Sequence, residues 1–155
     1  MFLEDEILLL AKPLINGSFE LFSGKVYFGR MWMLWEEEYA LQEFASHDIS
    51  VVWNLRTMPH NDIGVKEIWS SIEDHGIPED VNSFLNDVER IVARLKNGEN
   101  VFVHCFGGRG RTAIGLAALL VKEGATGEEA LTKVNSLVKG PETEEQKNFV
   151  LGLKN

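Results

Sequence analysis

The residues best suited to chemistry lie in one short stretch, His104 to Thr112, which reads His-Cys-Phe-Gly-Gly-Arg-Gly-Arg-Thr. It contains the only cysteine of the chain, Cys105, and three glycines. Glycines let successive backbone N–H groups point inward and form a concave site for anions. Arg111 adds a planar guanidinium group that can hold two oxygens of an oxyanion at once. The stretch therefore predicts a nucleophile beside a bound oxyanion, which is the starting arrangement for phosphoryl transfer to sulfur.

The neighbouring sequence supplies the elements that would position this stretch. An apolar run at 101–104 predicts a strand, and an apolar run at 111–123, ended by Gly124, predicts a helix. The unpaired N–H groups and the dipole at the start of that helix favour a bound phosphate and the thiolate form of a nearby cysteine. The alternative is a buried structural cysteine beside a glycine-rich turn. This alternative explains less well why five residue types stand at fixed positions within a stretch of nine residues.

The pattern H-C-x-x-G-x-x-R-[S/T] resembles the signature loop of the cysteine-dependent protein tyrosine and dual-specificity phosphatases. The resemblance implies that Cys105 is the nucleophile, that Thr112 helps the thiolate leave, and that His104 tunes the thiolate through the hydrogen bonds of the loop. It also implies no metal and no other cofactor. By the same resemblance the phosphate is bound by the loop residues Phe106, Gly107, Gly108, Arg109, Gly110 and Arg111.

A general acid is needed to protonate the leaving oxygen. In the tyrosine and dual-specificity phosphatases that the chain resembles, this acid is an aspartate on a mobile loop some thirty residues before the cysteine. Asp74 lies 31 positions before Cys105. Residues 72–78 are similar to the W-P-D-H-G-x-P loop of tyrosine phosphatases, with Ile-Glu in place of Trp-Pro. Asp62 and Asp80 are the alternatives, and Asp80 is better explained as a helix cap.

A positioned water must then hydrolyse the cysteinyl phosphate. Many tyrosine phosphatases carry a Q-T-x-x-Q motif whose last glutamine orients this water, and residues 142–146 read Glu-Thr-Glu-Glu-Gln. Gln146 is therefore a candidate for this role. Thr143 and Gln146 also fit a helix capping box, and the sequence leaves both explanations open.

Other residues have competing explanations. Arg56 follows the run 49–55, so it either faces the pocket or is a surface charge. Basic residues in the phosphate loop help phosphoinositide phosphatases of the resembling superfamily to bind extra phosphates, and Arg109 is the one such residue here. The tryptophans are expected to be core or loop anchors rather than a recognition platform; they are Trp32, Trp35, Trp53 and Trp69.

Strands alternate with helices through the chain, which predicts an α/β fold: a central mixed, mostly parallel sheet flanked by helices. Strands are expected at 19–22, 26–28, 49–55 and 101–104, and helices at 34–45, 81–95, 111–123, from Thr126 and from Thr143. Asp80 is expected to cap the second helix, and residues 56–80 form a long loop. At 155 residues and 45% hydrophobic content, residues 1–155 are expected to form a single phosphatase domain.

The composition restricts location and partners. The net charge of −9 disfavours nucleic acid and anionic membranes as partners, and one cysteine excludes an internal disulfide. The first six residues are acidic, and the apolar run at 7–11 is too short to span a bilayer. The four histidines show no ligand spacing that would predict a metal site. We expect a cytoplasmic protein, monomeric rather than oligomeric, that meets a phosphorylated protein or peptide.

The resemblance predicts a phosphatase that acts on phosphotyrosine, and also on phosphoserine and phosphothreonine. The nucleophile at position 105 of 155 leaves little room for the walls that make the pocket of phosphotyrosine-only members deep. The alternatives are a phosphoinositide or RNA 5′-phosphate phosphatase, a thiol enzyme acting on sulfur or arsenic oxyanions, and a non-catalytic phosphate-binding module.

Overall fold

The computed structural model describes residues 13–155, so the acidic start and the apolar run at 7–11 lie outside the described residues. Its centre is a five-stranded sheet with the order β1-β2-β5-β3-β4. The strands are β1 (Ile15–Leu21), β2 (Gly24–Gly29), β3 (Ile49–Asn54), β4 (Lys66–Trp69) and β5 (Asn100–His104). β1 is antiparallel to β2, and every other neighbouring pair is parallel. The prediction of a mixed, mostly parallel sheet flanked by helices is confirmed.

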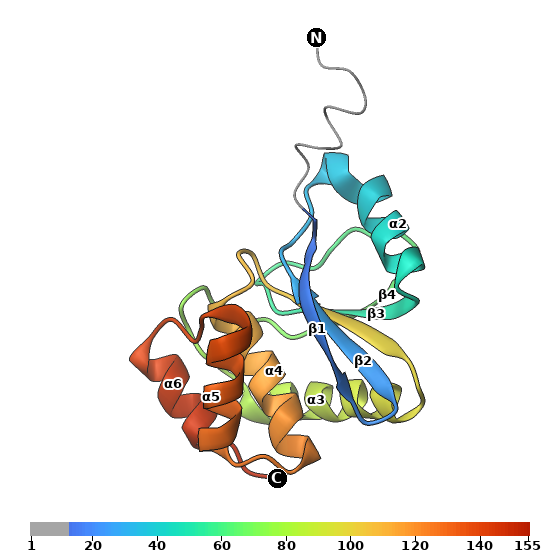
Figure 1. Ribbon diagram of the computed structural model, residues 1–155. Helices are drawn as coiled ribbons and strands as arrows, with labels where there is room; N and C mark the ends of the chain where they lie inside the picture. The colour runs from blue at the N-terminus through green and yellow to red at the C-terminus, as the bar shows by residue number, and fades with distance from the viewer. Residues whose placement is uncertain (1–12) are drawn as a thin grey trace.

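Helices cover both faces of this sheet (Figure 1). One face carries α2 (Glu37–Ser46), which follows the 3-10 turn η1 (Leu34–Glu36). The other face carries the remaining helices, which are α3 (Val81–Lys96), α4 (Gly110–Glu123), α5 (Gly127–Val138) and α6 (Glu144–Leu151). α3 and α4 pack on the strands, and α5 and α6 pack on α4.

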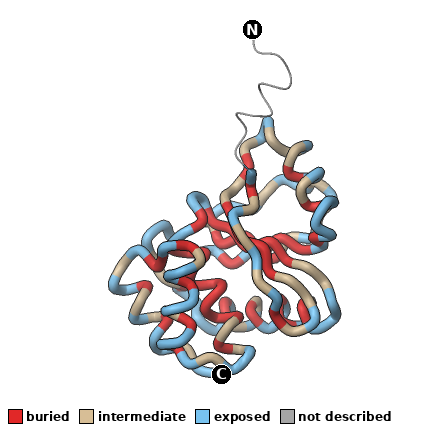
Figure 2. The backbone as a smooth tube through the Cα atoms, in the orientation of Figure 1, coloured by how far each residue is buried: buried red, intermediate tan, exposed pale blue. Residues whose placement is uncertain are grey.

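The central strand β5 shows why the core has two parts. Val101 and Val103 point into the larger apolar cluster, on the side of α3 to α6, and Phe102 points into the smaller one with Phe44 of α2. A parallel strand buried on both faces reads as a continuous apolar run, as 101–103 does. Figure 2 shows the buried residues concentrated in these central strands and in the adjoining helices.

The register of the parallel strands determines where the functional loops begin. Gly29 of β2 and Asn54 of β3 both pair with His104 of β5, and Asn54 also pairs with Trp69 of β4. Four strands therefore end in one row at their carboxyl ends. In parallel sheets this edge is where ligand-binding loops gather.

Most predicted helix boundaries are confirmed, and two expectations are corrected. Asp80 caps α3 by accepting the Ser83 N–H at 3.0 Å, as predicted. The stretch 56–80 is not all loop, because it contains β4. This strand is only four residues long and only Ile68 in it is buried, so its own sequence carries little strand signal. The helix expected from 34 begins as the 3-10 turn η1.

The tryptophans differ in environment. Trp32 and Trp53 are buried, as expected of core residues. Trp69 anchors a loop, because its indole N–H donates to the carbonyl oxygen of Arg56 at 2.8 Å. Trp35 is 83% exposed, so the prediction that it is a core or loop anchor is wrong. It lies in η1, which keeps it on the surface.

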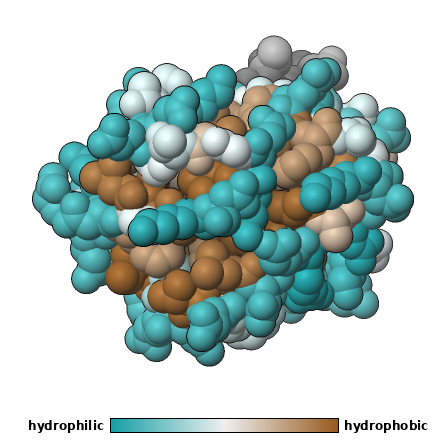
Figure 3. All heavy atoms as spheres, turned by 90° about the horizontal axis from the view of Figure 1, so that it is seen from below, coloured by the Kyte–Doolittle hydropathy of each residue, from teal (hydrophilic) through white to brown (hydrophobic). Residues whose placement is uncertain are grey.

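Hydrophilic side chains lie across apolar ones on the face seen from below in Figure 3, so apolar surface there is broken into patches. No helix within residues 13–155 combines the length and the apolar character needed to cross a membrane.

We predict that Gly29→Ala destabilises the protein strongly. An added Cβ would overlap the backbone carbonyl of Leu14, directly before the neighbouring strand β1, and this backbone cannot move aside without disturbing the sheet. Urea unfolding should show a loss of roughly 2 kcal/mol or more in the free energy of unfolding. The control is Gly152→Ala, where the nearest atom lies 3.5 Å from the added Cβ. An unchanged midpoint for Gly29→Ala would contradict the close approach of these strands.

Candidate active site

Cys105 follows directly after β5 and is 3% exposed. Its Sγ accepts hydrogen bonds from the Gly108 N–H, at 3.3 Å, and from the Thr112 hydroxyl, at 3.1 Å. Hydrogen bonds of this kind favour a negatively charged acceptor. The structure therefore brings the predicted Cys105 and Thr112 together, with donors aimed at the sulfur.

The loop between Cys105 and α4 curls tightly because of its glycines. Gly108 has a φ of 82°, a left-handed conformation that glycine adopts at little cost. A Cβ on Gly108 would also lie 2.8 Å from the Gly29 carbonyl oxygen, so the loop packs closely on the end of β2. α4 begins at Gly110, and its positive end faces the loop.

Phe106, Gly107 and Arg109 form the exposed rim of this loop, and Gly108 and Gly110 are buried. Arg109 occupies the N-cap position of α4. The carbonyl oxygen of Phe106 accepts the Met31 N–H at 3.3 Å, which ties the rim to the segment after β2.

Arg111 joins the phosphate loop to the loop that carries Asp74. The Arg111 side chain is buried, and its Nη1 donates to the carbonyl oxygen of Ile72 at 3.1 Å. Its Nη2 lies 3.6 Å from Oδ1 of Asp74, whose own side chain is 66% exposed. Asp74 is thus next to Arg111, the arginine predicted to bind phosphate, and its side chain is still open to solvent.

The other two aspartates proposed as the acid are engaged elsewhere. Asp80 caps α3, as described above. Asp62 accepts the Gly64 N–H at 2.9 Å within the loop before β4. The described contacts therefore associate Asp74 alone among the three with Arg111.

Gln146 is fully buried and links the acid loop to α6. Its Nε2 donates to the Gly76 carbonyl oxygen at 3.0 Å, and its Oε1 accepts the N–H groups of Glu142 and Thr143. The capping box with Thr143 is present. The same side chain also lies against Gly110, so Gln146 touches both the acid loop and the phosphate loop.

Glu142 is a site residue that the sequence did not reveal as one. Its Oε1 accepts the N–H of Gly110, at 3.2 Å, in the loop expected to bind phosphate. The same oxygen lies 4.0 Å from Nδ1 of His75, and Nε2 of His75 lies 3.6 Å from Asp74. The only signal in the sequence is that Glu142 stands where the Q-T-x-x-Q motif has its first glutamine.

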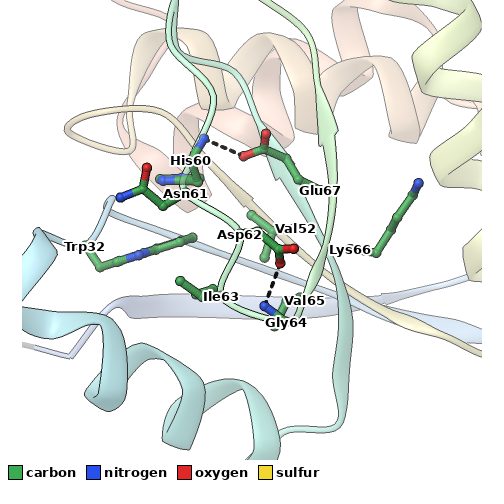
Figure 4. A pocket seen from close by; sticks show the side chains of 10 residues that line it. All are labelled: Trp32, Val52, His60, Asn61, Asp62, Ile63, Gly64, Val65, Lys66 and Glu67. Atoms are coloured by element: carbon green, nitrogen blue, oxygen red, sulfur yellow. Dashed lines mark hydrogen bonds between the residues drawn. The ribbon is translucent and has the colours of Figure 1, made fainter.

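A second histidine supports His104. Nδ1 of His104 lies 2.9 Å from the Cys105 carbonyl oxygen, and its Nε2 lies 2.7 Å from Nε2 of His60. His60 stacks on Trp32, with ring centroids 3.8 Å apart, and its Nδ1 lies 3.3 Å from Nη2 of Arg56. Figure 4 shows His60 and Trp32 at one end of a cavity of about 540 Å³.

The partners determine which nitrogen of each histidine carries hydrogen. A carbonyl oxygen only accepts, so Nδ1 of His104 donates to Cys105. Nε2 of a neutral His104 then accepts, so Nε2 of His60 donates to it. Nδ1 of His60 is left as an acceptor, and it faces a donor of Arg56. The result is one directed chain of hydrogen bonds from Arg56 to the backbone of Cys105.

Burial keeps both histidines neutral. Burial, together with the nearby His60 and Arg56, lowers the pKa of His104 to about 3. Burial, followed by the charge of Arg56, lowers the pKa of His60 to about 4. Both rings are therefore uncharged at pH 7, as the directed chain requires. Within residues 13–155, no group of three or more His, Cys, Asp or Glu side chains is arranged to hold a metal ion.

A family of phosphatases matches this arrangement in sequence. The model of the family described as "Polymorphic toxin system, DSP-PTPase phosphatase" matches residues 28–125, from the end of β2 to just beyond α4. The chain belongs to this DSP-PTPase phosphatase family. The predicted membership of the tyrosine and dual-specificity phosphatase superfamily is thereby confirmed.

Solved structures of other phosphatases resemble this DSP-PTPase phosphatase. The active form of Tk-PTP is 27% identical, with a TM-score of 0.71, and the match covers 90% of this chain and 95% of that one. Human DUSP28 is 19% identical (TM-score 0.69; 91% and 92% covered). PTPMT1 in complex with PI(5)P is 18% identical (TM-score 0.66; 86% and 91% covered). The last two show a shared fold only. A search of curated proteins gave no match.

We predict that His60 supports catalysis by donating to His104. His60→Phe keeps a ring against Trp32 and removes the donor, so kcat should fall about tenfold, a typical cost of an unpaired buried acceptor. His60→Gln keeps an N–H donor and should retain more activity. Steady-state kinetics on p-nitrophenyl phosphate and thermal melts of both variants check this. Equal kcat values for the two variants would contradict the directed chain.

Proposed function

We propose that this phosphatase hydrolyses phosphotyrosine in proteins, and phosphoserine and phosphothreonine more slowly, through a cysteinyl-phosphate intermediate. The supporting observation is the placement of Cys105 Sγ beside two hydrogen-bond donors of its own loop, with Nη2 of Arg111 3.6 Å from Oδ1 of Asp74 on the neighbouring loop. A nucleophile, an anion-binding group and an acid thus meet at one edge of the sheet.

In the first step, Sγ of Cys105 attacks phosphorus, and the S–P bond forms as the bond to the leaving oxygen breaks. Arg111 and the loop N–H groups bind the three equatorial oxygens, where charge is spread in the transition state. Asp74 gives its proton to the leaving phenoxide or alkoxide. The dephosphorylated polypeptide then departs.

In the second step, a water attacks phosphorus and the S–P bond breaks. Asp74, now a carboxylate, takes a proton from this water, and inorganic phosphate forms. The Thr112 hydroxyl donates to the departing thiolate, and His104 holds the carbonyl of Cys105 in place. Gln146 and Glu142 act as positioning residues in this proposal, since they fix the acid loop and the Gly110 amide.

The basicity of the leaving group determines which substrate should be hydrolysed fastest. A tyrosine phenoxide, with a pKa of about 10, leaves more easily than a serine or threonine alkoxide. Phosphotyrosine should therefore react fastest. A second candidate substrate is a phosphoinositide, which the exposed Arg109 in the phosphate loop favours, since it could meet a further phosphate group.

The proposal includes a cytoplasmic monomer of one phosphatase domain, residues 1–155, that needs no metal. A catalytic thiol functions in a reducing compartment, and the chain has no second cysteine that could trap it in an internal disulfide. The net charge of −9 disfavours nucleic acid as a substrate.

A panel assay in EDTA tests the substrate class. We expect hydrolysis of phosphotyrosine peptides, and slower hydrolysis of phosphothreonine and phosphoserine peptides. Cys105→Ser should abolish turnover on all three while still binding phosphate, because the loop amides and Arg111 remain. Activity confined to a phosphoinositide or an RNA 5′-triphosphate would overturn the proposed substrate. More than a few per cent residual activity in Cys105→Ser would overturn the mechanism.

A pH profile tests the general acid. Asp74→Asn cannot protonate the leaving oxygen, so kcat on phosphotyrosine should fall on the order of 10²–10⁴-fold. The limb of the profile in which kcat falls from acidic to neutral pH should disappear. A substrate with a very good leaving group should be affected much less. Asp62→Asn is the matched control, and if it gives this pattern instead, Asp62 is the acid.

A further inference from the structure

The most exposed apolar side chains gather around the mouth of the site. Among large apolar residues within 13–155, the four most exposed are Trp35 (83%), Leu34 (72%), Met58 (65%) and Phe106 (58%). Phe106 belongs to the phosphate loop, and the other three line a groove of about 430 Å³. Exposed apolar residues are common singly, but a cluster marks a site of interaction. We name this groove the mouth groove; Met31 and Arg56 also line it.

The mouth groove is continuous with the phosphate loop. Met31 follows β2, Arg56 follows β3 and Phe106 follows β5, and these three strands end in one row. The Met31 N–H donates to the Phe106 carbonyl oxygen at 3.3 Å, and Arg56 Nη1 lies 3.3 Å from the sulfur of Met31. The mouth groove therefore adjoins the phosphate loop, within reach of a polypeptide whose phosphate is bound there.

Charge is distributed unevenly along the groove. Arg56 lies at the end near the phosphate loop, and Glu37 lines the groove beyond Trp35. Glu38 follows it in the first turn of α2 and is exposed. A matching ligand is anionic at one end, apolar in the middle and basic or neutral at the other. An anionic bilayer fits poorly, because it would bring negative charge to these glutamates and to a chain of net charge −9.

We propose that the mouth groove binds the polypeptide next to the phosphorylated residue and selects large apolar side chains there. This inference rests on the proposed function, since it takes the occupant to be a phosphorylated polypeptide. The phosphate occupies the Cys105 loop, and a flanking leucine or aromatic side chain packs against Leu34, Trp35 and Met58. The volume of the groove lies in the range of known ligand sites.

Binding to the inactive Cys105→Ser variant tests the selection without turnover. Two phosphotyrosine peptides differ only in carrying leucine or serine at the two positions on each side of the phosphotyrosine. We expect the leucine peptide to bind at least about fivefold more tightly in titration calorimetry, since apolar side chains leave water. Adding Trp35→Ser to Cys105→Ser should abolish this preference. Adding Leu34→Ser gives an independent repeat in a second exposed residue.

The matched control is Leu151→Ser, on α6, which removes an apolar side chain of 44% exposure that does not line the mouth groove. In the Cys105→Ser background it should leave the preference intact. Equal affinities for the two peptides, no measurable binding of either, or a preference that survives Trp35→Ser would each overturn the inference. Co-sedimentation of the Cys105→Ser protein with phosphatidylcholine–phosphatidylserine vesicles, lost in Trp35→Ser, would overturn it in favour of a membrane surface.

A hydrolysis assay distinguishes a failure of this inference from a failure of the proposed function. The wild-type enzyme is assayed on the same two peptides and on p-nitrophenyl phosphate, which is too small to reach along the groove. If the leucine peptide is bound selectively but neither peptide is hydrolysed, the proposed function fails and the groove stands. If both are hydrolysed with equal kcat/KM, the proposed function stands and the inference fails.

Discussion

The common end-point of four parallel strands is the constraint on which the site depends. Because β2, β5, β3 and β4 end in one row, the segments that follow them emerge side by side. Cys105 lies in the segment after β5, Arg56 in the segment after β3, and Asp74 in the segment after β4. A slip of one residue in a strand would turn its side chains to the opposite face and move its loop along the edge. The geometry of the site therefore depends directly on the register of the sheet.

Charge balance at the site is maintained by contacts between loops. Arg111 gives one nitrogen to the Ile72 carbonyl and faces the Asp74 carboxylate with another, so a single cation is shared between phosphate binding and the acid loop. Glu142 adds a second carboxylate at the Gly110 amide. Two carboxylates around an anion site oppose the retention of inorganic phosphate. In the proposed mechanism, we therefore expect the carboxylates of Asp74 and Glu142 to favour release of the phosphate product.

Much of this organisation could be predicted from sequence, for local reasons. The phosphate loop is nine consecutive residues. The cap of α3 joins Asp80 to Ser83, and the cap of α5 joins Thr126 to Glu129, so each spans only three positions and leaves a pattern in the chain. His60 could not be found this way, since it meets His104 across 44 positions through strand register. The composition of β4 does not predict a strand, because pairing with β3 stabilises it. Trp35 is exposed and lies in the 3-10 turn η1, whereas the pattern predicted an amphipathic helix from residue 34.

The two halves of the site differ in how firmly they are attached to the fold. Eleven residues of α4 are buried, among them Arg111 and Thr112, so its first turn cannot move without disturbing the core. The segment around Asp74 is held mainly at its root, by Ile72, and through single hydrogen bonds to Gly76 and His75. On warming, weakly attached segments open before the core does. If Asp74 and Arg111 have the roles proposed for them, we expect heating to impair proton transfer at a lower temperature than phosphate binding.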